Sequence, residues 1–560
     1  MQFKKAKDIE VKNFIAAECF ELAKDRLPDE YNVLGMRWLL TWKYDDKYQD
    51  GRKAKARAIV LGYQDPSYAD RKTAAPTPSR ASRQLFFQLC SWKRFKMAKG
   101  DISGAFLQGD DLTEELWCRP LKEITEKLEV KEGTPMLMKK AAYGLVQAPL
   151  HWYESISRFL SSLGYQKLLV EPCCWIWKDE TGCVRSIIHG HVDDFLFGGR
   201  DYCKIHRGLM EKIKQAYDWG TWETDHFVQC GIDVCQKSDY SIELKQDRFI
   251  DEMTEIFLTK DRSRQVECPT TDEEKRKLRG ALGSLSWVTG QTCFLYAVDV
   301  NHMLTKIPQS TVADIVTTNK IIRDMKKMKD QVYKIHAFDE HAPLEFIAWS
   351  DAAWANRPNE VDSTEGIFIG MCTPKLREGS HSPVTPVFWK SGCINRVCRS
   401  PATAETMAAL NTEDDLTYVW VMWSELLGHN IQLRDVDHAA SLTKGTLVTD
   451  SKNLYDKLHR ATPVVKGPEK RADIEALSLR QNLQRSQTTL RWVEGGAMLA
   501  NVLTKCHEKA QGWLFLSLDF TWKLVYDQNM CSSKKRRAAG IQPLQDTQHS
   551  HVRAKEEGET

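Results

Sequence analysis

The sequence predicts a multidomain α+β protein whose C-terminal part contains a layered α/β domain. The chain has 560 residues, which is too long for one hydrophobic core, so about two to four domains are expected. The first half contains hairpin-like and strand–turn–helix patterns. After residue 345, strand patterns alternate with helical ones, which is typical of an α/β layer.

Composition narrows the class of protein. Apolar residues make up 42% of the chain and charged residues 28%, and no apolar run approaches the roughly 20 residues of a membrane span. The opening segment MQFKKAKDIE lacks the apolar region of a secretory signal. We therefore expect an intracellular protein without a membrane partner. The sixteen cysteines are scattered, so reduced core thiols are favoured over a zinc site, and no disulfide-linked partner is expected.

Basic residues gather near the N-terminus, although the net charge of the whole chain is only +3. Residues 35–100 contain fifteen Lys or Arg against five Asp, with Trp38, Trp42, Tyr44, Tyr63 and Trp92 between them. Cations mixed with aromatic rings are typical of a surface that contacts phosphates and stacks bases. An ordinary solvated basic face is the alternative.

The first half of the chain contains five local patterns. Residues 1–34 predict a charged, helical lead-in, and residues 35–65 predict a hairpin around the turn-rich DDKYQDG. FKMAKGDISGAFLQGD predicts a short strand that ends near Asp101 and is followed by a turn. Residues 143–164 have apolar side chains at helical spacing and end at Gly164. VRSIIHGHVDDFLFGG predicts two strands joined by a tight turn that carries Asp193 and Asp194.

The second half begins with mixed patterns, including the helical KIIRDMKKMKD, to which we assign no chemistry. LEFIAWSDAAW then predicts a strand ending in an Asp, SPATAETMAALN a helix, GTLVTDSKNLYDKL a strand entering a helix, and LRWVEGG another strand. The last thirty residues are polar and predict disorder. KKRR at residues 534–537 fits either a nuclear import signal or solvated charge.

Two constellations of carboxylates carry chemistry. Asp101 and the Asp193–Asp194 pair meet if their strands share a sheet, and Asp351, Glu405 and Asp450 come from three elements of the later domain. Phosphoryl transfer uses two magnesium ions roughly 3.5 to 4 Å apart, bridged by such carboxylates. Side chains of neighbouring strand residues point to opposite faces, so we expect Asp193 to dominate over Asp194. The alternatives are turn chemistry at the Asp pair, an exposed helix face at Glu405 and N-capping at Asp450.

The order of the motifs adds a resemblance. KGDISGAFLQGD, LMKKAAYGLVQAPLHWYESISRFLSSLGY and HVDDFLFGG resemble, in order and spacing, the reverse transcriptase of copia-type LTR retrotransposon Pol polyproteins. WSDAAWANRPNEVDSTEGIFIG, FWKSGCINRVCRSPATAETMAAL, LVTDSKNLYDKL and LRWVEGGAMLANVLTK resemble that family's ribonuclease H domain. The resemblance implies a right-hand polymerase with fingers, palm and thumb, followed by an α/β ribonuclease H-like domain.

The resemblance also implies domain boundaries. The expected parts are a lead-in (1–34), fingers and palm (35–258), thumb or connection (259–345), a ribonuclease H-like domain (346–506) and a tail (507–560) that is disordered from about residue 530. Partners would be an RNA template, a DNA or RNA primer, an RNA–DNA hybrid and deoxynucleoside triphosphates. The expected location is a cytoplasmic virus-like particle, the nucleus, or both.

Roles carry over residue by residue. Catalysis in the polymerase would fall to Asp101, Asp193 and Asp194, with Asp101 and Asp193 holding two Mg²⁺, or Mn²⁺ in their place. Phe106 would exclude a 2′-hydroxyl, and Gln147, Lys55 and Arg57 would contact the nucleotide. The alternatives are a core aromatic for Phe106 and a solvated strand face for Lys55 and Arg57. In the ribonuclease H domain, Asp351, Glu405 and Asp450 would be catalytic and bind two further ions.

The chain departs from the family at two positions. His191 stands where the family has a Tyr that backs the primer end, and Asn501 stands where it has the fourth ribonuclease H carboxylate. Asn keeps an oxygen ligand but loses a negative charge, so the second ion should bind less tightly and the nuclease should be weakened. A rival hypothesis is therefore a decayed or domesticated chain that binds nucleic acid without catalysis. The intact Asp101, Asp193 and Gln147 oppose it.

Overall fold

The protein is described here by a computed structural model, which covers residues 2–22, 33–44, 51–462, 465, 469–524, 530–531 and 538–540. The chain forms two compact units. Unit 1 comprises Met1–Pro78, Ala98–Thr181 and Arg185–Glu223, and unit 2 comprises Ser79–Met97, Gly182–Val184 and Thr224–Thr560. The predicted turn at residues 45–50 and the KKRR run lie outside the described residues, as does most of the predicted disordered tail.

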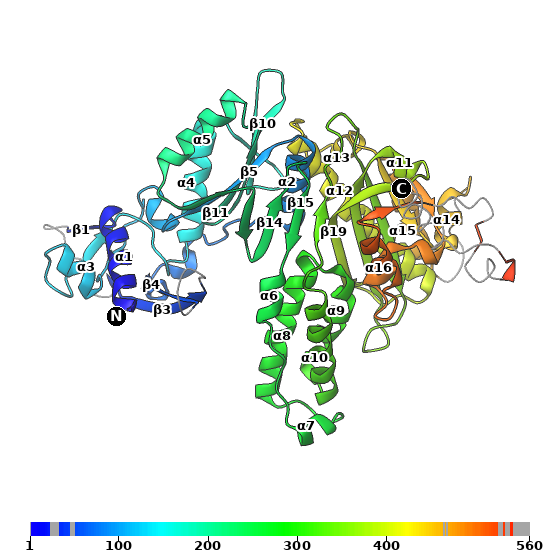
Figure 1. Ribbon diagram of the computed structural model, residues 1–560, viewed down its shortest axis with the longest axis horizontal. Helices are drawn as coiled ribbons and strands as arrows, with labels where there is room; N and C mark the ends of the chain where they lie inside the picture. Colours follow the sequence, from blue (N-terminus) through cyan, green and yellow to red (C-terminus); the bar gives the residue numbers. More distant parts are fainter. Residues whose placement is uncertain are drawn as a thin grey trace, which may run out of the picture. The chain divides into compact units, whose positions relative to one another are not determined.

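The main sheet of unit 1 has six strands in the order β12-β5-β11-β10-β9-β8 (Figure 1). The strands are β5 (Lys96–Ile102), β8 (Gln166–Lys167), β9 (Cys174–Lys178), β10 (Val184–His191), β11 (Asp194–Gly199) and β12 (Trp219–Thr224). Helices α4 (Ala148–Ser162) and α5 (Lys204–Ala216) bury Trp152, Ile156 and Leu209 in the same core as Phe195 and Phe197 of β11. Asp101 lies one residue before the end of β5, in agreement with the predicted strand end.

The predicted N-terminal hairpin is present. Strands β3 (Met36–Tyr44) and β4 (Arg52–Val60) pair antiparallel along their whole length. Helix α1 (Gln2–Ala16) packs on β4 and on α3 (Lys122–Lys127). A small sheet in the order β1-β7-β6-β2 completes this part; its strands are β1 (Phe20–Glu21), β2 (Val33–Leu34), β6 (Trp117–Cys118) and β7 (Met136–Met138).

Helix α4 begins later than its apolar spacing predicts, at Ala148 instead of Tyr143. Gly144 has φ +100°, and a Cβ there would lie 1.9 Å from the carbonyl oxygen of Val60, so this stretch is a tight turn against β4 that only glycine fits. Pro149 in the first turn of the helix favours a start at that point. Tyr143 therefore precedes the helix and lies in a turn.

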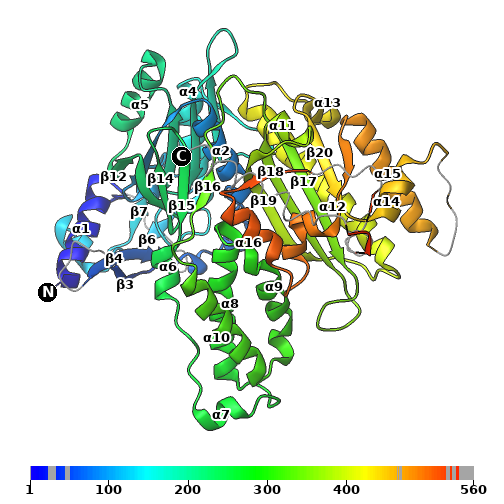
Figure 2. The same cartoon turned by 45° about the vertical axis from the view of Figure 1, so that its right-hand side comes forward.

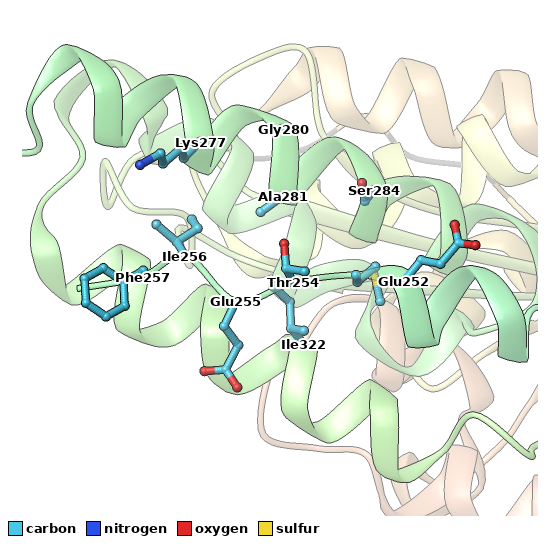
Figure 3. A pocket seen from close by; sticks show the side chains of 11 residues that line it. Glu252, Thr254, Glu255, Ile256, Phe257, Lys277, Gly280, Ala281, Ser284 and Ile322 are labelled. Carbon is cyan, nitrogen blue, oxygen red and sulfur yellow. The ribbon is translucent and has the colours of Figure 1, made fainter. Parts of the chain in front are cut away.

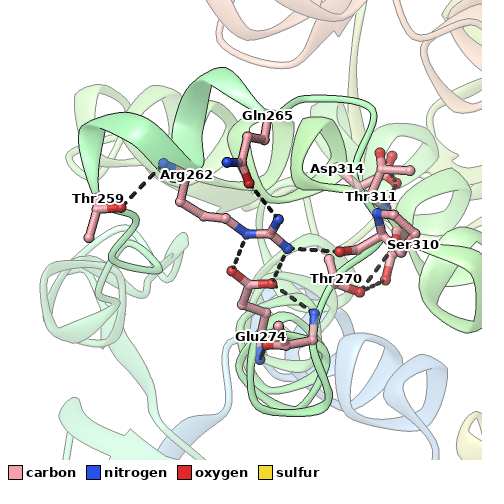
Figure 4. A network of polar contacts seen from close by, with 10 residues as sticks. Thr259, Arg262, Gln265, Thr270, Glu274, Ser310, Thr311 and Asp314 are labelled. Carbon is pink, nitrogen blue, oxygen red and sulfur yellow. Dashed lines mark hydrogen bonds and ion pairs between the residues drawn. The ribbon is translucent and has the colours of Figure 1, made fainter.

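Unit 2 contains a helical bundle of α8 (Asp272–Gln291), α9 (Ala297–Lys306) and α10 (Val312–Lys327) around a core of Leu282, Leu285 and Ile322. Helix α7 (Lys260–Arg264) is tied to the N-terminus of α8 because Arg262 donates to both carboxylate oxygens of Glu274, at 2.9 and 2.8 Å (Figure 4). These hydrogen bonds lower the pKa of Glu274 to about 2. The same carboxylate caps α8 through the backbone N–H of Thr271.

A cavity of about 440 Å³ runs along the bundle between α8 and the segment 252–257 (Figure 3). Its α8 wall consists of the small residues Gly280, Ala281 and Ser284, with Lys277 at one end. None of the residues predicted to carry chemistry lines this cavity.

Two further sheets belong to unit 2. An antiparallel sheet consists, in order, of β13 (His226–Gln229), β14 (Ile232–Gln236), β15 (Ile242–Lys245) and β16 (Tyr333–Ile335). The larger sheet has the order β21-β20-β17-β18-β19-β22, and Figure 2 shows its central strands side by side. Its strands are β17 (Glu345–Ala353), β18 (Thr364–Cys372), β19 (Ser382–Cys393), β20 (Gly445–Thr449), β21 (Thr489–Trp492) and β22 (Thr521–Trp522).

The larger sheet is mixed. Strand β17 pairs parallel with β20 and antiparallel with β18, and β20 pairs parallel with β21. Helix α12 (Pro401–Leu426) packs on β17 and β18, while α14 (Lys452–His459) and α15 (Lys470–Arg485) follow β20. Among the described residues, we find no helix with the length and apolar character of a membrane span.

Candidate active sites

The backbone brings Asp101 and Asp193 together in unit 1. Strand β5 lies beside β11, and the N–H of Ile102 donates to the carbonyl oxygen of Asp193 at 2.8 Å. On the other side of β5, a Cβ on Gly220 would lie 3.3 Å from Asp101 Oδ2, so a larger residue would crowd this carboxylate. Two aspartates that are 92 positions apart in the sequence thus lie on neighbouring segments of the backbone at one edge of the sheet.

The Asp-Asp pair lies at a tight turn, as predicted. His191 pairs with Asp194 in the β10–β11 ladder, which leaves Val192 and Asp193 as the two central residues of the turn. Val192 has φ +60°, which is strained for a β-branched residue. Its carbonyl oxygen accepts a hydrogen bond from Trp152 Nε1 at 2.6 Å. Helix α4 therefore holds the tip of the hairpin in this conformation.

Asp194 differs from Asp193 in its surroundings. Its Oδ1 lies 3.4 Å from Nζ of Lys99, and both side chains are largely buried, with 16% and 12% exposed. Burial raises the pKa of Asp194 to about 6, and the nearby Asp101 and Asp193 add to the rise while Lys99 opposes it. The ionisation of Asp194 near neutral pH therefore depends on Lys99, a residue that sequence reasoning missed.

The predicted nucleotide residues fall into two groups. The rings of Phe106 and Tyr143 pack together with their centroids 4.8 Å apart. The guanidinium of Arg57 lies over the Tyr143 ring, 4.8 Å from its centroid. Burial raises the pKa of Tyr143 to about 12, with the nearby charge of Asp193 as a further cause. Phe106, Tyr143 and Arg57 thus form one surface beside the carboxylates. Tyr143 was missed, although it lies in the YGL segment that carries the resemblance.

Lys55 and Gln147 are placed differently. Lys55 lies two residues from Arg57 on β4, and both cations oppose the rise in pKa that burial causes at Glu10 of α1. Gln147 is only 6% exposed, and neither end of its side-chain amide has a hydrogen-bond partner among the described residues. Contact of either residue with a nucleotide stays a prediction.

Only part of the predicted basic segment is exposed to solvent. Trp42 and Tyr63 are exposed, with 51% and 70% of their area accessible. Arg80 and Arg83, however, lie in α2 (Arg80–Trp92) and are turned inward: Arg80 donates to the carbonyl oxygens of Gly290 and Trp389. Counting these two arginines as phosphate contacts was wrong, because the apolar pattern of α2 buries the helix on nearly every side.

The second constellation assembles fully in unit 2. Asp351 lies on β17, Glu405 on the first turns of α12, and Asp450 directly after β20. Ligand atoms of these three carboxylates all lie within 4.8 Å of one another, and they are the one such group among the described residues. The carboxylates of unit 1 do not form so tight a group. Ser451, next to Asp450, caps α14 through the N–H of Leu454, so capping and clustering coexist here.

Burial and mutual repulsion raise the pKa values of the carboxyl groups in the unit 2 cluster. Burial raises the pKa of Glu405 well above its ordinary value, with the charges of Asp351 and Asp450 as further causes. Burial likewise raises the pKa of Asp450 to about 7 and that of Asp351. Glu405 Oε2 is buried without a hydrogen-bond partner among the described residues. Three close carboxylates with a free oxygen fit a divalent ion, which favours oxygen ligands.

Asn501 is firmly held beside this cluster. It lies in the short helix η8 (Leu499–Leu503) and is 2% exposed. Its Nδ2 donates to the carbonyl oxygen of Gly495 at 2.7 Å, and its Oδ1 accepts from Lys505 Nζ. Lys505 Nζ also lies 3.4 Å from Asp351 Oδ2, and the hydroxyl of Thr504 donates to the same oxygen. Sequence reasoning did not anticipate these roles of Thr504 and Lys505.

Unit 1 thus presents an Asp hairpin on a six-stranded sheet, and unit 2 presents three clustered carboxylates around a mixed sheet. Residues 18–271 match the family described as reverse transcriptase (RNA-dependent DNA polymerase). This segment is thus similar to reverse transcriptases, which agrees with the resemblance of its motifs to copia-type retrotransposon proteins.

The curated relatives of this chain are transposon polyproteins. A retrovirus-related Pol polyprotein from transposon RE1 of Arabidopsis thaliana is 24% identical over 418 residues, which cover 71% of this chain and 26% of the relative. One from transposon TNT 1-94 of Nicotiana tabacum is 27% identical over 286 residues, 47% of this chain and 21% of the relative. The transposon Ty1-DR6 Gag-Pol polyprotein of Saccharomyces cerevisiae is 23% identical over 492 residues, 82% of this chain and 26% of the relative.

The chain thus spans about a quarter of the length of these relatives. Among solved structures, the N-terminal RNase H domain of a Mycobacterium tuberculosis protein, fused to maltose binding protein, matches with a TM-score of 0.19 and 16% identity. The match covers 30% of this chain and 97% of that chain.

Proposed function

We propose that the chain is an RNA-directed DNA polymerase that extends a primer on an RNA template with deoxynucleoside triphosphates. The observation that carries this proposal is the meeting of Asp101 and Asp193 through the hydrogen bond between Ile102 and Asp193, at 2.8 Å. In the right-hand description, the β3–β4 hairpin would be the fingers, the six-stranded sheet of unit 1 the palm, and the bundle of α8, α9 and α10 the thumb.

Asp101 and Asp193 would hold Mg²⁺, which when bound would neutralise charge on the reacting phosphates. Arg57 offers a guanidinium on the same surface, and its position over the Tyr143 ring fixes where that charge points. Lys99 keeps Asp194 ionised, which adds negative charge beside the two metal-holding carboxylates. Each of these groups acts by position and charge, which is what phosphoryl transfer requires of a protein.

Phe106 would select deoxynucleotides. It is 8% exposed and supported by the ring of Tyr143, so it cannot turn aside to admit a larger sugar. A ribose 2′-hydroxyl above such a ring would lose its solvation without gaining a hydrogen bond, which disfavours ribonucleotides.

The cluster of Asp351, Glu405 and Asp450 would hydrolyse the RNA strand of an RNA–DNA hybrid with the help of bound Mg²⁺. We propose that this activity is weakened, because Asn501 brings no negative charge to the site and its Oδ1 already accepts from Lys505.

The test is Mg²⁺-dependent incorporation of deoxynucleotides on a primed RNA template by the full chain. Asp193→Asn should abolish extension, whereas Asp201→Asn, an exposed aspartate in the turn after β11, should leave it unchanged. Cleavage of labelled hybrid RNA is followed in parallel with Asp450→Asn and, as its matched control, Asp456→Asn on α14. An inactive parent protein that still binds template with steep salt dependence would support the non-catalytic alternative.

A further inference from the structure

Lys505 lies inside the carboxylate cluster of unit 2, in a position that is not typical of a surface lysine. Its Nζ lies 3.4 Å from Asp351 Oδ2 and donates to Asn501 Oδ1. Its side chain is 33% exposed, while that of Asp351 is 1% exposed. The ammonium therefore reaches from the rim of the site to its most buried carboxylate.

The segment that precedes Lys505 is fixed by several contacts. The carbonyl oxygen of Thr504 accepts from Asn356 Nδ2 at 2.8 Å, and the Thr504 hydroxyl donates to Asp351. A Cβ on Gly366 of β18 would lie 2.7 Å from the Thr504 side chain, so this segment packs closely on the sheet. Since Asn501 is anchored to Gly495 as well, the place of the ammonium is determined by the fold.

Lysines on neighbouring elements of unit 2 pair with other acids. Lys390 lies 2.9 Å from Glu365 on the neighbouring strands, and Lys452 lies 2.8 Å from Asp456 on α14. Among the ion pairs of the described residues, Lys505 is the cation that pairs with a member of the cluster.

The charges of the site can be counted. Three carboxylates carry three negative charges when ionised, and Lys505 carries one positive charge, which leaves a net charge of two negatives. One divalent cation balances that charge. A second would raise the site to a net positive charge in a partly buried setting, which is unfavourable without a further anion. An aspartate at position 501 would add that anion, but the chain has Asn501.

We propose that Lys505 is a built-in cation that stands in for a second metal ion, so that this site binds a single divalent ion. The inference rests on the proposed ribonuclease H function and specifies the ligand content of that same site. Asn501 and Lys505 then act as a pair, in which the neutral amide accepts the hydrogen bond that directs the ammonium toward Asp351.

The test counts bound Mn²⁺ by electron paramagnetic resonance, with Mn²⁺ alone as the probe. The protein is the full chain carrying Asp101→Asn and Asp193→Asn, so that the polymerase site does not contribute. One ion should bind, and Asp450→Asn should remove it. Lys505→Met should admit a second ion with an affinity at least tenfold higher than any second site in the parent. Lys452→Met, which removes an equivalent charge outside the cluster, should not.

Circular dichroism would check that each variant is folded. Lys505→Gln is a second variant at this position, for the case that Lys505→Met does not fold. Two equivalent ions in the parent, or one ion in both Lys505 variants, would overturn the inference and leave the ribonuclease H proposal intact. Absence of any ion that depends on Asp450 would overturn both. Cleavage of the RNA–DNA hybrid, measured separately, tests the proposed ribonuclease H function and does not depend on the number of bound ions.

Discussion

Replacing Lys99 by Met should shift the pH dependence of DNA synthesis. The variant keeps the apolar stem but removes the ammonium 3.4 Å from Asp194. At that separation a unit charge pair is worth about 5 kcal/mol with an effective dielectric constant of 20, and about 1 kcal/mol in bulk water. The small exposure of both side chains places the real value between these limits.

The sign follows from which form of Asp194 the ammonium favours. Lys99 stabilises the carboxylate, so its loss raises the pKa of Asp194 from about 6 to between ~7 and ~9.5, given about 1.4 kcal/mol for each tenfold change. The ionised fraction at pH 7 then falls from about nine tenths to between roughly one half and a few thousandths. Extension at pH 7 should drop about twofold to a few hundredfold and recover progressively as the pH rises toward 9.5.

The assay is single-nucleotide extension at saturating Mg²⁺, template and deoxynucleotide from pH 6 to pH 9.5. Lys99→Arg is the matched control, because it keeps the positive charge and should retain the parental profile. A Lys99→Met profile that coincides with the parent would refute the idea that Lys99 keeps Asp194 ionised. A uniform loss at every pH would show that Lys99 acts on the fold instead.

Three other substitutions test separate parts of the structure. Phe106→Val should raise ribonucleotide incorporation relative to deoxynucleotide at least tenfold, measured as the ratio of kcat/KM values, whereas Phe106→Tyr should not. Trp152→Phe removes the hydrogen bond to Val192 and leaves a cavity in the core, so it should slow extension and lower the unfolding free energy by about 2–4 kcal/mol in urea titrations. Burial lowers the pKa of His206 from 6.5 to about 4, so protonation of the unfolded chain should lower the parental unfolding free energy by about 2 kcal/mol between pH 7.5 and pH 5. His206→Gln should lack that part of the loss, and equal pH dependence in both proteins would contradict this assignment.

Local sequence patterns predicted the elements that carry the chemistry. Apolar β-forming residues on either side of the Asp pair located the β10–β11 hairpin with Asp193 at its tip, and the strand patterns located β17 and β20 with Asp351 and Asp450 at or near their ends. Such features depend on a few neighbouring residues, so a single sequence contains them. The start of α4 was misjudged because the close contact of Gly144 with Val60 joins segments 84 positions apart.

Partners of the catalytic groups were less predictable. Lys99 precedes Asp101 by two residues, yet its partner Asp194 comes from another strand and is reached only through the pairing of β5 with β11. Tyr143 likewise meets Phe106 and Arg57 through tertiary packing. No local pattern encodes these distances, so sequence reasoning found the acids and missed the groups that set their charge.

Asn501 shows why a departure from a family motif need not signify decay. A neutral residue that replaces a buried carboxylate by drift would be expected to leave donors or acceptors unsatisfied, at a cost of about 1–3 kcal/mol each. Here both ends of the Asn501 amide are bonded, to Gly495 and to Lys505, and the ammonium continues to Asp351. Glu405 Oε2, which has no partner among the described residues, is the atom that a divalent ion would satisfy. The change is thus accommodated by its surroundings, which favours a site adapted to fewer ions over one that has lost its function.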